Sequence, residues 1–124
     1  WENEILDHLF GKGAYSPPTI YVALSSANPG ESGSGLSEPG GNGYARVATS
    51  AGDWSAADGG LLDNADAIEF GTAAGDWGTM THFALFDAAT GGNMLAYGAL
   101  NQSKTVNGGD TVRFAAGDLE VTLD

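Results

Sequence analysis

WGTMTHFALFDAATGGNMLAYGAL, residues 77–100, contains two runs of strand-type residues with a turn between them. Aromatic and aliphatic side chains occur in both runs, and residues 87–93 supply Asp, Thr, two glycines and Asn. Glycine adopts positive φ without steric cost, and Asp and Asn hydrogen-bond to their own backbone, so such a segment reverses the chain. The pattern therefore predicts an antiparallel β-hairpin over roughly 80–100.

The rest of the chain predicts further short strands. Residues 19–25, 44–48, 67–70, 111–114 and 119–123 are rich in β-branched and aromatic residues, and we expect the last two to pair across residues 115–118. Short strands at this spacing, joined by Gly and Asp turns, favour an all-β fold. We expect one domain over residues 1–124, an antiparallel β-sandwich of about seven or eight strands, with jelly-roll and immunoglobulin-like orders both open.

Alternation within these strands predicts which side chains form the core. The expected core residues are Ile20, Val22, Leu24, Val47, Ile68, Phe70, Phe83, Leu85, Leu95, Tyr97, Val112, Phe114, Leu119 and Val121.

Two segments outside the strands have distinct characters. Residues 1–11 predict a short N-terminal helix, because Ile5 and Leu9 lie four apart and Leu6 and Phe10 extend the same apolar stripe. A helix this short needs a surface to dock on. Residues 28–43 are dominated by Gly, Pro and Ser around a single large apolar residue, Leu36, and predict a long surface loop. We expect both segments to gain order mainly from a partner.

Composition narrows the function classes. Sixteen acidic residues against four basic ones give a net charge of −12, which disfavours nucleic acid and anionic membranes as partners. There is no cysteine, so no disulfide or thiolate metal site is possible. No apolar run approaches the ~20 residues that span a bilayer, which predicts a soluble chain.

One short motif recurs. Ala51-Gly-Asp-Trp54 is repeated at residues 74–77, and residues 116–119 form a weaker copy that ends in Leu. We interpret the motif as reused turn chemistry, in which Gly and Asp make the corner and the following bulky residue enters the core.

Candidate metal ligands are sparse. His8 and His82 have no ligand spacing typical of zinc or iron sites and are expected to be structural or solvent-facing. An acidic segment offers oxygen ligands for calcium but does not match the EF-hand pattern, so a solvated loop is the favoured interpretation. Its members are Asp58, Asp63, Asn64, Asp66 and Glu69.

Catalytic motifs are not supported either. The Ser-Gly stretch at 30–35 does not meet the G-x-S-x-G frame, and the glycine-rich segments lack the phosphate-binding P-loop pattern. A buried carboxylate pair for glycoside hydrolysis is possible in number, but nothing in the sequence selects one. We therefore expect a protein without enzymatic activity, metal or cofactor.

Several ordered blocks resemble a family of small tailed-bacteriophage proteins, many of them labelled tail-fibre proteins. The blocks are residues 4–10 (EILDHLF), 17–24 (PPTIYVAL), 43–46 (GYAR), 76–79 (DWGT), 81–87 (THFALFD), 109–118 (GDTVRFAAGD) and 121–123 (VTL). The resemblance covers nearly the whole chain. It implies a virion protein, decorating a capsid or forming part of a tail fibre, and carries no catalytic motif.

The leading functional prediction is a non-enzymatic structural protein, present in many copies and as a homo-oligomer, that binds capsid or tail subunits. Its expected intersubunit contacts are Ile5, Leu6, Leu9, Phe10, Leu36 and Trp54. The alternative is a carbohydrate-binding receptor module that stacks sugars on Trp54, Trp77 or Tyr44.

Overall fold

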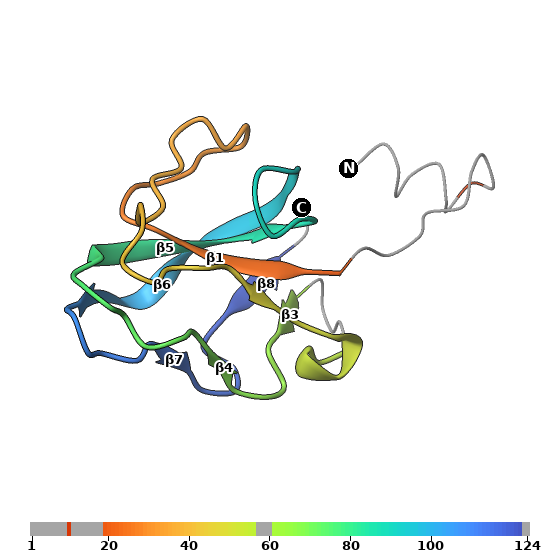
Figure 1. The fold of residues 1–124 in the computed structure, drawn as a ribbon. Coiled ribbons are helices and arrows are strands. Elements are labelled where there is room, and N and C mark those ends of the chain that lie inside the picture. Colours follow the sequence, from red (N-terminus) through yellow and green to blue (C-terminus); the bar gives the residue numbers. More distant parts are fainter. Residues whose placement is uncertain (1–9, 11–18, 57–60, 123–124) are drawn as a thin grey trace.

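The fold is built almost entirely from antiparallel strands (Figure 1). The computed structural model describes residue 10, residues 19–56 and residues 61–122. Within that part, the elements are β1 (Tyr21–Ser25), β2 (Val47–Ala48), a 3₁₀ turn η1 (Ala51–Asp53), β3 (Leu61–Asp63), β4 (Ile68–Glu69), β5 (Gly78–Phe86), β6 (Met94–Val106), β7 (Arg113–Phe114) and β8 (Glu120–Thr122). Every pairing among them is antiparallel, which confirms the all-β prediction.

The predicted hairpin is present as β5 and β6, which makes it the longest strand pair of the described chain. At its turn, Asp87 Oδ1 accepts the backbone N–H of Asn93 at 2.7 Å, and Asp87 Oδ2 accepts the Asn93 amide at 3.0 Å. Gly91 and Gly92 take the positive φ values of 60° and 74° that the turn requires. The turn chemistry that the sequence indicated therefore operates, although β6 runs further than expected, to Val106.

The hairpin forms half of a four-stranded sheet in the order β2-β1-β5-β6. Two separate strand pairs, β3–β8 and β4–β7, lie on one side of this sheet (Figure 1). The second layer is thus made of two short pairs.

The expected pairing of residues 111–114 with 119–123 is wrong. β7 pairs with β4, and β8 pairs with β3. The buried side chain of Asn64 explains the difference, because its amide donates to the Ala115 carbonyl at 2.9 Å and accepts the Leu119 N–H at 2.9 Å. The Ala115 carbonyl and the Leu119 N–H stand on either side of the 115–118 turn, where the first hydrogen bonds of a hairpin would form. Both groups bond to Asn64 instead.

The main core lies between the sheet and the strand pairs. Nine predicted core residues are buried in it: Val22, Leu24, Ile68, Phe70, Phe83, Leu85, Val112, Phe114 and Leu119. Ile20 and Val47 pack against this core while partly exposed. Trp77, Met80 and Val106 join it although the core prediction omitted them. Val121 has a side chain outside the described set.

Two other predicted core residues, Leu95 and Tyr97, are not in the main core, and both side chains stay partly exposed. Tyr97 lies opposite Ala84 in the β5–β6 ladder and packs on a second, smaller cluster of Ala23, Ala84 and Phe86. Successive strand residues point to opposite faces, so this cluster lies on the other face of the sheet. The two central strands are therefore buried on both faces.

One sequence prediction falls at the N-terminal end of the chain. The helix predicted over residues 1–11 lies outside the described residues, apart from Phe10, whose side chain is 72% exposed. In the part of the chain that the structure covers, we find no helix with the length and apolarity to cross a membrane.

Candidate functional site

The most organised surface feature is a covering loop, residues 26–46, that follows β1 and contains neither helix nor strand. In Figure 1 it is the orange segment that rises on the side of the sheet away from β3, β4, β7 and β8. Its Leu36 side chain packs against the cluster of Ala23, Ala84 and Phe86, and its Pro29 is fully buried. The loop therefore closes the outer face of the sheet.

Hydrogen bonds within the chain hold the covering loop in place. Ser26 N–H donates to the Ser37 carbonyl at 3.0 Å, and Ser37 N–H donates to the hydroxyl of buried Ser25 at 3.0 Å. Gly35 N–H donates to the Pro29 carbonyl at 2.9 Å, and a Cβ on Gly35 would lie 2.3 Å from the Asn28 carbonyl oxygen. Only glycine fits there. The loop thus has an internal source of order that we did not expect from its composition.

A buried ion pair, which we call the Arg46 network, connects this loop to the rest of the molecule. Arg46 Nε and Nη2 donate to the two carboxylate oxygens of Glu38 at 2.8 and 2.9 Å. The Tyr44 hydroxyl donates to Glu38 Oε1 at 2.7 Å and accepts the Leu24 N–H of β1 at 3.1 Å. The Arg46 side chain is only 5% exposed, so its charge depends on this pairing.

Arg46 also reaches the hairpin turn. Its Nη1 donates to the carbonyls of Ala88 and Gly91 at 3.0 and 2.8 Å, and its guanidinium lies 3.7 Å from the centre of the Phe86 ring. Planar guanidinium suits both the two-point carboxylate contact and the stacking on an aromatic ring. One side chain therefore fixes the covering loop and the 87–93 turn relative to each other.

The network shifts the acidity of its members in opposite directions. Burial raises the pKa of Glu38, but the hydrogen bonds from Arg46 and Tyr44 and the Arg46 charge outweigh it, and the net pKa lies below its usual range. Burial, followed by the hydrogen bond to Glu38, raises the pKa of Tyr44. Both shifts favour an ionised Glu38 and a neutral Tyr44, the states in which the carboxylate accepts from Arg46 and from the Tyr44 hydroxyl, which suits a structural role.

The rim formed by the covering loop and the 87–93 turn is exposed and built from small polar residues. Its exposed members include Glu31, Ser32 and Ser34 from the loop and Thr90, Gly91 and Gly92 from the turn. Glu38, the carboxylate of the Arg46 network, is paired with Arg46. The groups that the rim can offer to a partner are therefore its hydroxyls and backbone groups, which Arg46 holds on a fixed backbone.

The predicted contact residues are placed as follows. Ile5, Leu6 and Leu9 lie outside the described residues, and Phe10 is exposed. Leu36 and Trp54 are each partly buried against their own domain, Trp54 through a 2.9 Å hydrogen bond from Nε1 to the Thr49 hydroxyl. The intersubunit role of these six residues stays a prediction.

Of the aromatic residues considered as a sugar platform, Trp77 is buried in the main core, whereas Tyr44 and Trp54 pack against it while partly exposed. Trp77 is 7% exposed, and its Nε1 donates to the Asn42 carbonyl at 2.9 Å. Tyr44 meets Trp77 edge-on, with 5.3 Å between ring centres, and its hydroxyl belongs to the Arg46 network. The Trp77 ring is therefore too buried to stack on a sugar.

The candidate metal ligands are dispersed. His82 Nδ1 lies 2.8 Å from the Thr81 hydroxyl, while His8 and Asp58 fall outside the described residues. Asp63 Oδ1 accepts a hydrogen bond from the Ser55 hydroxyl at 2.7 Å. The Asn64 side chain is hydrogen-bonded to the backbone of Ala115 and Leu119. Among described residues, no three His, Asp or Glu side chains gather as a metal site would require.

Sequence reasoning gave no role to Glu38 or Arg46, and it considered Asn64 only as a possible calcium ligand. One signal was available: Arg46 is one of only four basic residues and follows Tyr44 closely, directly after the glycine-rich segment. Nothing comparable marks Glu38, although its partners Tyr44 and Arg46 lie within eight residues of it. The backbone partners of Asn64, Ala115 and Leu119, lie 51 and 55 residues away.

Comparison with known proteins adds the remaining finding. A family model described as podophage GP4 fiber I protein gp80 matches residues 1–122. No curated protein matches the chain.

Proposed function

Because the chain belongs to the podophage GP4 fiber I protein gp80 family and is a structural component of a phage virion, we propose that it binds neighbouring virion subunits in many copies. It performs this role without catalysing a reaction. The family description favours a fibre position over capsid decoration, which is the second placement.

The observation that carries this proposal is the fixed rim of the covering loop and the 87–93 turn. Arg46 joins the two through Glu38, Ala88 and Gly91, so the backbone of the rim is ordered before any partner arrives. Ordering a surface in advance lowers the entropic cost of association. Small polar residues also let a partner approach the backbone closely.

Apolar contacts complete the proposed docking surface. Phe10 is a large apolar side chain that is 72% exposed, and the stripe of Ile5, Leu6 and Leu9 precedes it in sequence. Burying such side chains against a partner stabilises an interface by about 1.5–3 kcal/mol each. Leu36 and Trp54, partly exposed, would contribute from the domain itself.

A bulky charged substitution on the rim tests this function. Ser34→Arg adds a long side chain at an exposed position of the covering loop, and Ser103→Arg adds the same side chain at an exposed position of β6. Phage carrying each variant would be purified and the copy number of the chain measured by quantitative mass spectrometry.

We expect Ser34→Arg to lower the copy number severalfold and Ser103→Arg to leave it unchanged. Imaging of tagged particles would then show whether the chain lies at the tail or on the capsid. Equal incorporation of both variants would contradict docking through the rim.

A further inference from the structure

Strand β6 lies at an open edge of the four-stranded sheet (Figure 1). Among the described strands it is hydrogen-bonded to β5 alone, and alternate residues of an antiparallel strand turn their N–H and C=O groups away from the partner. Within the described chain, the one further backbone hydrogen bond of β6 is at its last residue, where the Val106 carbonyl accepts the Trp77 N–H at 2.9 Å. The outer edge of β6 therefore presents backbone groups that no other described residue engages.

This edge lacks the usual protection against pairing with another strand. Natural sheet edges are kept short, or carry proline or charge, or are covered by another segment. The opposite edge strand, β2, is two residues long. In contrast, β6 is thirteen residues long, and its residues 94–103 contain neither proline nor a charged residue. An edge of this kind is a template for strand addition.

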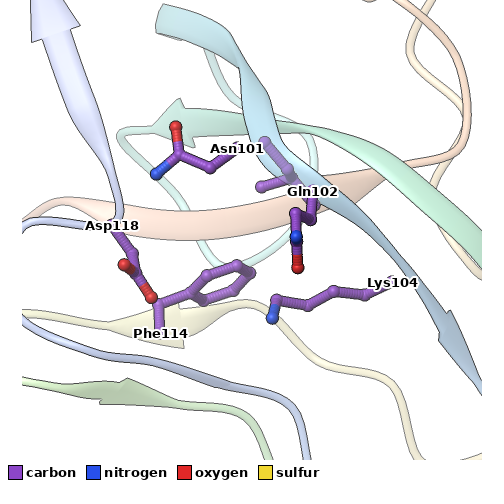
Figure 2. A pocket seen from close by; sticks show the side chains of 6 residues that line it. Asn101, Gln102, Lys104, Phe114 and Asp118 are labelled. Atoms are coloured by element: carbon purple, nitrogen blue, oxygen red, sulfur yellow. The ribbon is translucent and has the colours of Figure 1, made fainter.

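The part of β6 best suited to pairing is the segment of residues 96–100. Residues 96–99 pair in regular register with residues 82–85 of β5. Beyond Leu100 the ladder shifts register, and the polar side chains of β6 line a cleft beside Phe114 (Figure 2). A bulge bends a strand away from a flat edge. The regular, uncharged edge therefore ends at Leu100.

The segment Ala-Tyr-Gly-Ala-Leu is complementary in size to its own reverse. If two copies run antiparallel with Gly98 opposite Gly98, Tyr97 of each copy lies opposite Ala99 of the other, and Leu100 lies opposite Ala96. Tyr97 packs on the outer cluster, whereas Ala96 and Leu100 pack on the main core. A large side chain therefore meets a small one on both faces of the joined sheet.

The distribution of charge favours the same occupant. Two copies that each carry a net charge of −12 repel one another, and like charges placed opposite each other destabilise a strand pair. Residues 88–109 contain no Asp or Glu, so pairing through β6 places no carboxylate of one strand opposite a carboxylate of the other. We infer that two copies of this chain pair through the β6 edge, antiparallel about a two-fold axis at Gly98, and so join their sheets into one.

Sedimentation equilibrium of the purified full chain, from about 1 to about 500 µM, tests this inference. We expect the mass to rise to that of two chains. Ala99→Glu places a carboxylate opposite Tyr97 and near its own copy across the axis, and should raise the dissociation constant about tenfold or more. Ala67→Glu adds the same charge at an exposed position before β4 and should associate as the natural chain does. The mass of a single chain at about 500 µM, the mass of three chains, or equal association of the two variants would overturn the inference.

Cross-linking tests the register directly, because the chain has no cysteine of its own. Residues directly opposite in an antiparallel pair lie about 4.5–5.5 Å apart between Cα atoms, a distance that a disulfide spans. Tyr97→Cys mixed with Ala99→Cys under mild oxidation should therefore give the mixed disulfide well above its statistical share, as measured by mass spectrometry. A statistical mixture from variants that keep the β-type circular dichroism spectrum would contradict the two-fold pairing. Both experiments use the isolated chain, so this inference and docking through the rim can fail separately.

Discussion

At the scale of single residues, Glu38 and Arg46 decide how the covering loop is held. Arg46 is almost fully buried, and its charge is balanced by two hydrogen bonds to one carboxylate. Removing one member of such a pair leaves a buried charge without compensation, which costs more than an ordinary surface contact. The pair is therefore a sensitive point of the fold.

Glu38→Gln should lower the free energy of unfolding by about 1–3 kcal/mol at pH 7. The folded-state pKa of Glu38 lies below its unfolded value, so the carboxylate stabilises the fold above the unfolded pKa, and this contribution is lost as pH falls through the folded pKa. The difference between natural chain and variant should therefore shrink on going from pH 7 to pH 3. Urea unfolding at several pH values measures it.

The matched control is Glu31→Gln, an exposed glutamate of the same loop, which should change stability by less than about 0.5 kcal/mol. A stability difference for Glu38→Gln that stays constant down to pH 3 would show that the carboxylate charge is not what holds Arg46.

At the scale of elements, one turn design recurs three times. In residues 50–53, 107–110 and 115–118, the Asp N–H donates to the carbonyl three residues earlier at 3.0 Å. The Asp carboxylate in turn accepts the N–H of that earlier residue at 2.9 Å. The residue before Asp is glycine each time, with φ of 92° at Gly109 and 86° at Gly117.

Because the carboxylate satisfies a backbone donor, Asp118→Ala should destabilise the chain by about 1 kcal/mol, and Asp110→Ala by a similar amount. Asp118→Asn keeps an acceptor oxygen and should cost less than Asp118→Ala. Urea unfolding of the three variants gives these values, and hydrogen exchange of the Ala115 amide reports the turn directly. Equal losses for the Asn and Ala variants would indicate that charge, not the hydrogen bond, is responsible.

These elements also show what a sequence can predict. The β5–β6 hairpin depends on neighbouring residues, so its signal is local, and the prediction is confirmed. Of the three motifs predicted to be Gly-Asp turns, those at 51–54 and 116–119 form the turn. Leu119 follows its turn into the core as expected, at 0% exposure. The motif at 74–77 departs from the pattern, because Asp76 accepts the N–H of the distant Gly108 instead.

Contacts between residues far apart in the sequence could not be predicted from local patterns. The pairing of β7 with β4 depends on an asparagine fifty-one residues from one of its partners, Ala115. Leu95 and Tyr97 alternate as core residues do, but the covering loop makes the outer face partly buried too, which weakens alternation as a guide. The β5–β6 ladder shifts register between Met80 and His82, beside the cleft lined by Gln102, Lys104 and Phe114 (Figure 2), and no single residue of the sequence marks that shift.

At the scale of the whole molecule, a small sheet is closed on both faces, by two strand pairs on one and by the covering loop on the other. The chain carries a net charge of −12, and the rim is the surface at which the covering loop and the 87–93 turn are joined through Arg46. The apolar residues Ile5, Leu6, Leu9 and Phe10 precede this domain in the sequence.

Deleting residues 1–10 should therefore separate folding from assembly. The described core is built from residues 20–119, so the truncated chain should keep a β-type circular dichroism spectrum and cooperative urea unfolding. It should be lost from purified particles, since Ile5, Leu6, Leu9 and Phe10 can each stabilise an interface by about 1.5–3 kcal/mol when buried. Glu2→Gln/Glu4→Gln, which keeps the apolar stripe, should incorporate normally. A truncated chain present at its usual copy number would exclude these side chains from docking and leave the rim as the attachment surface.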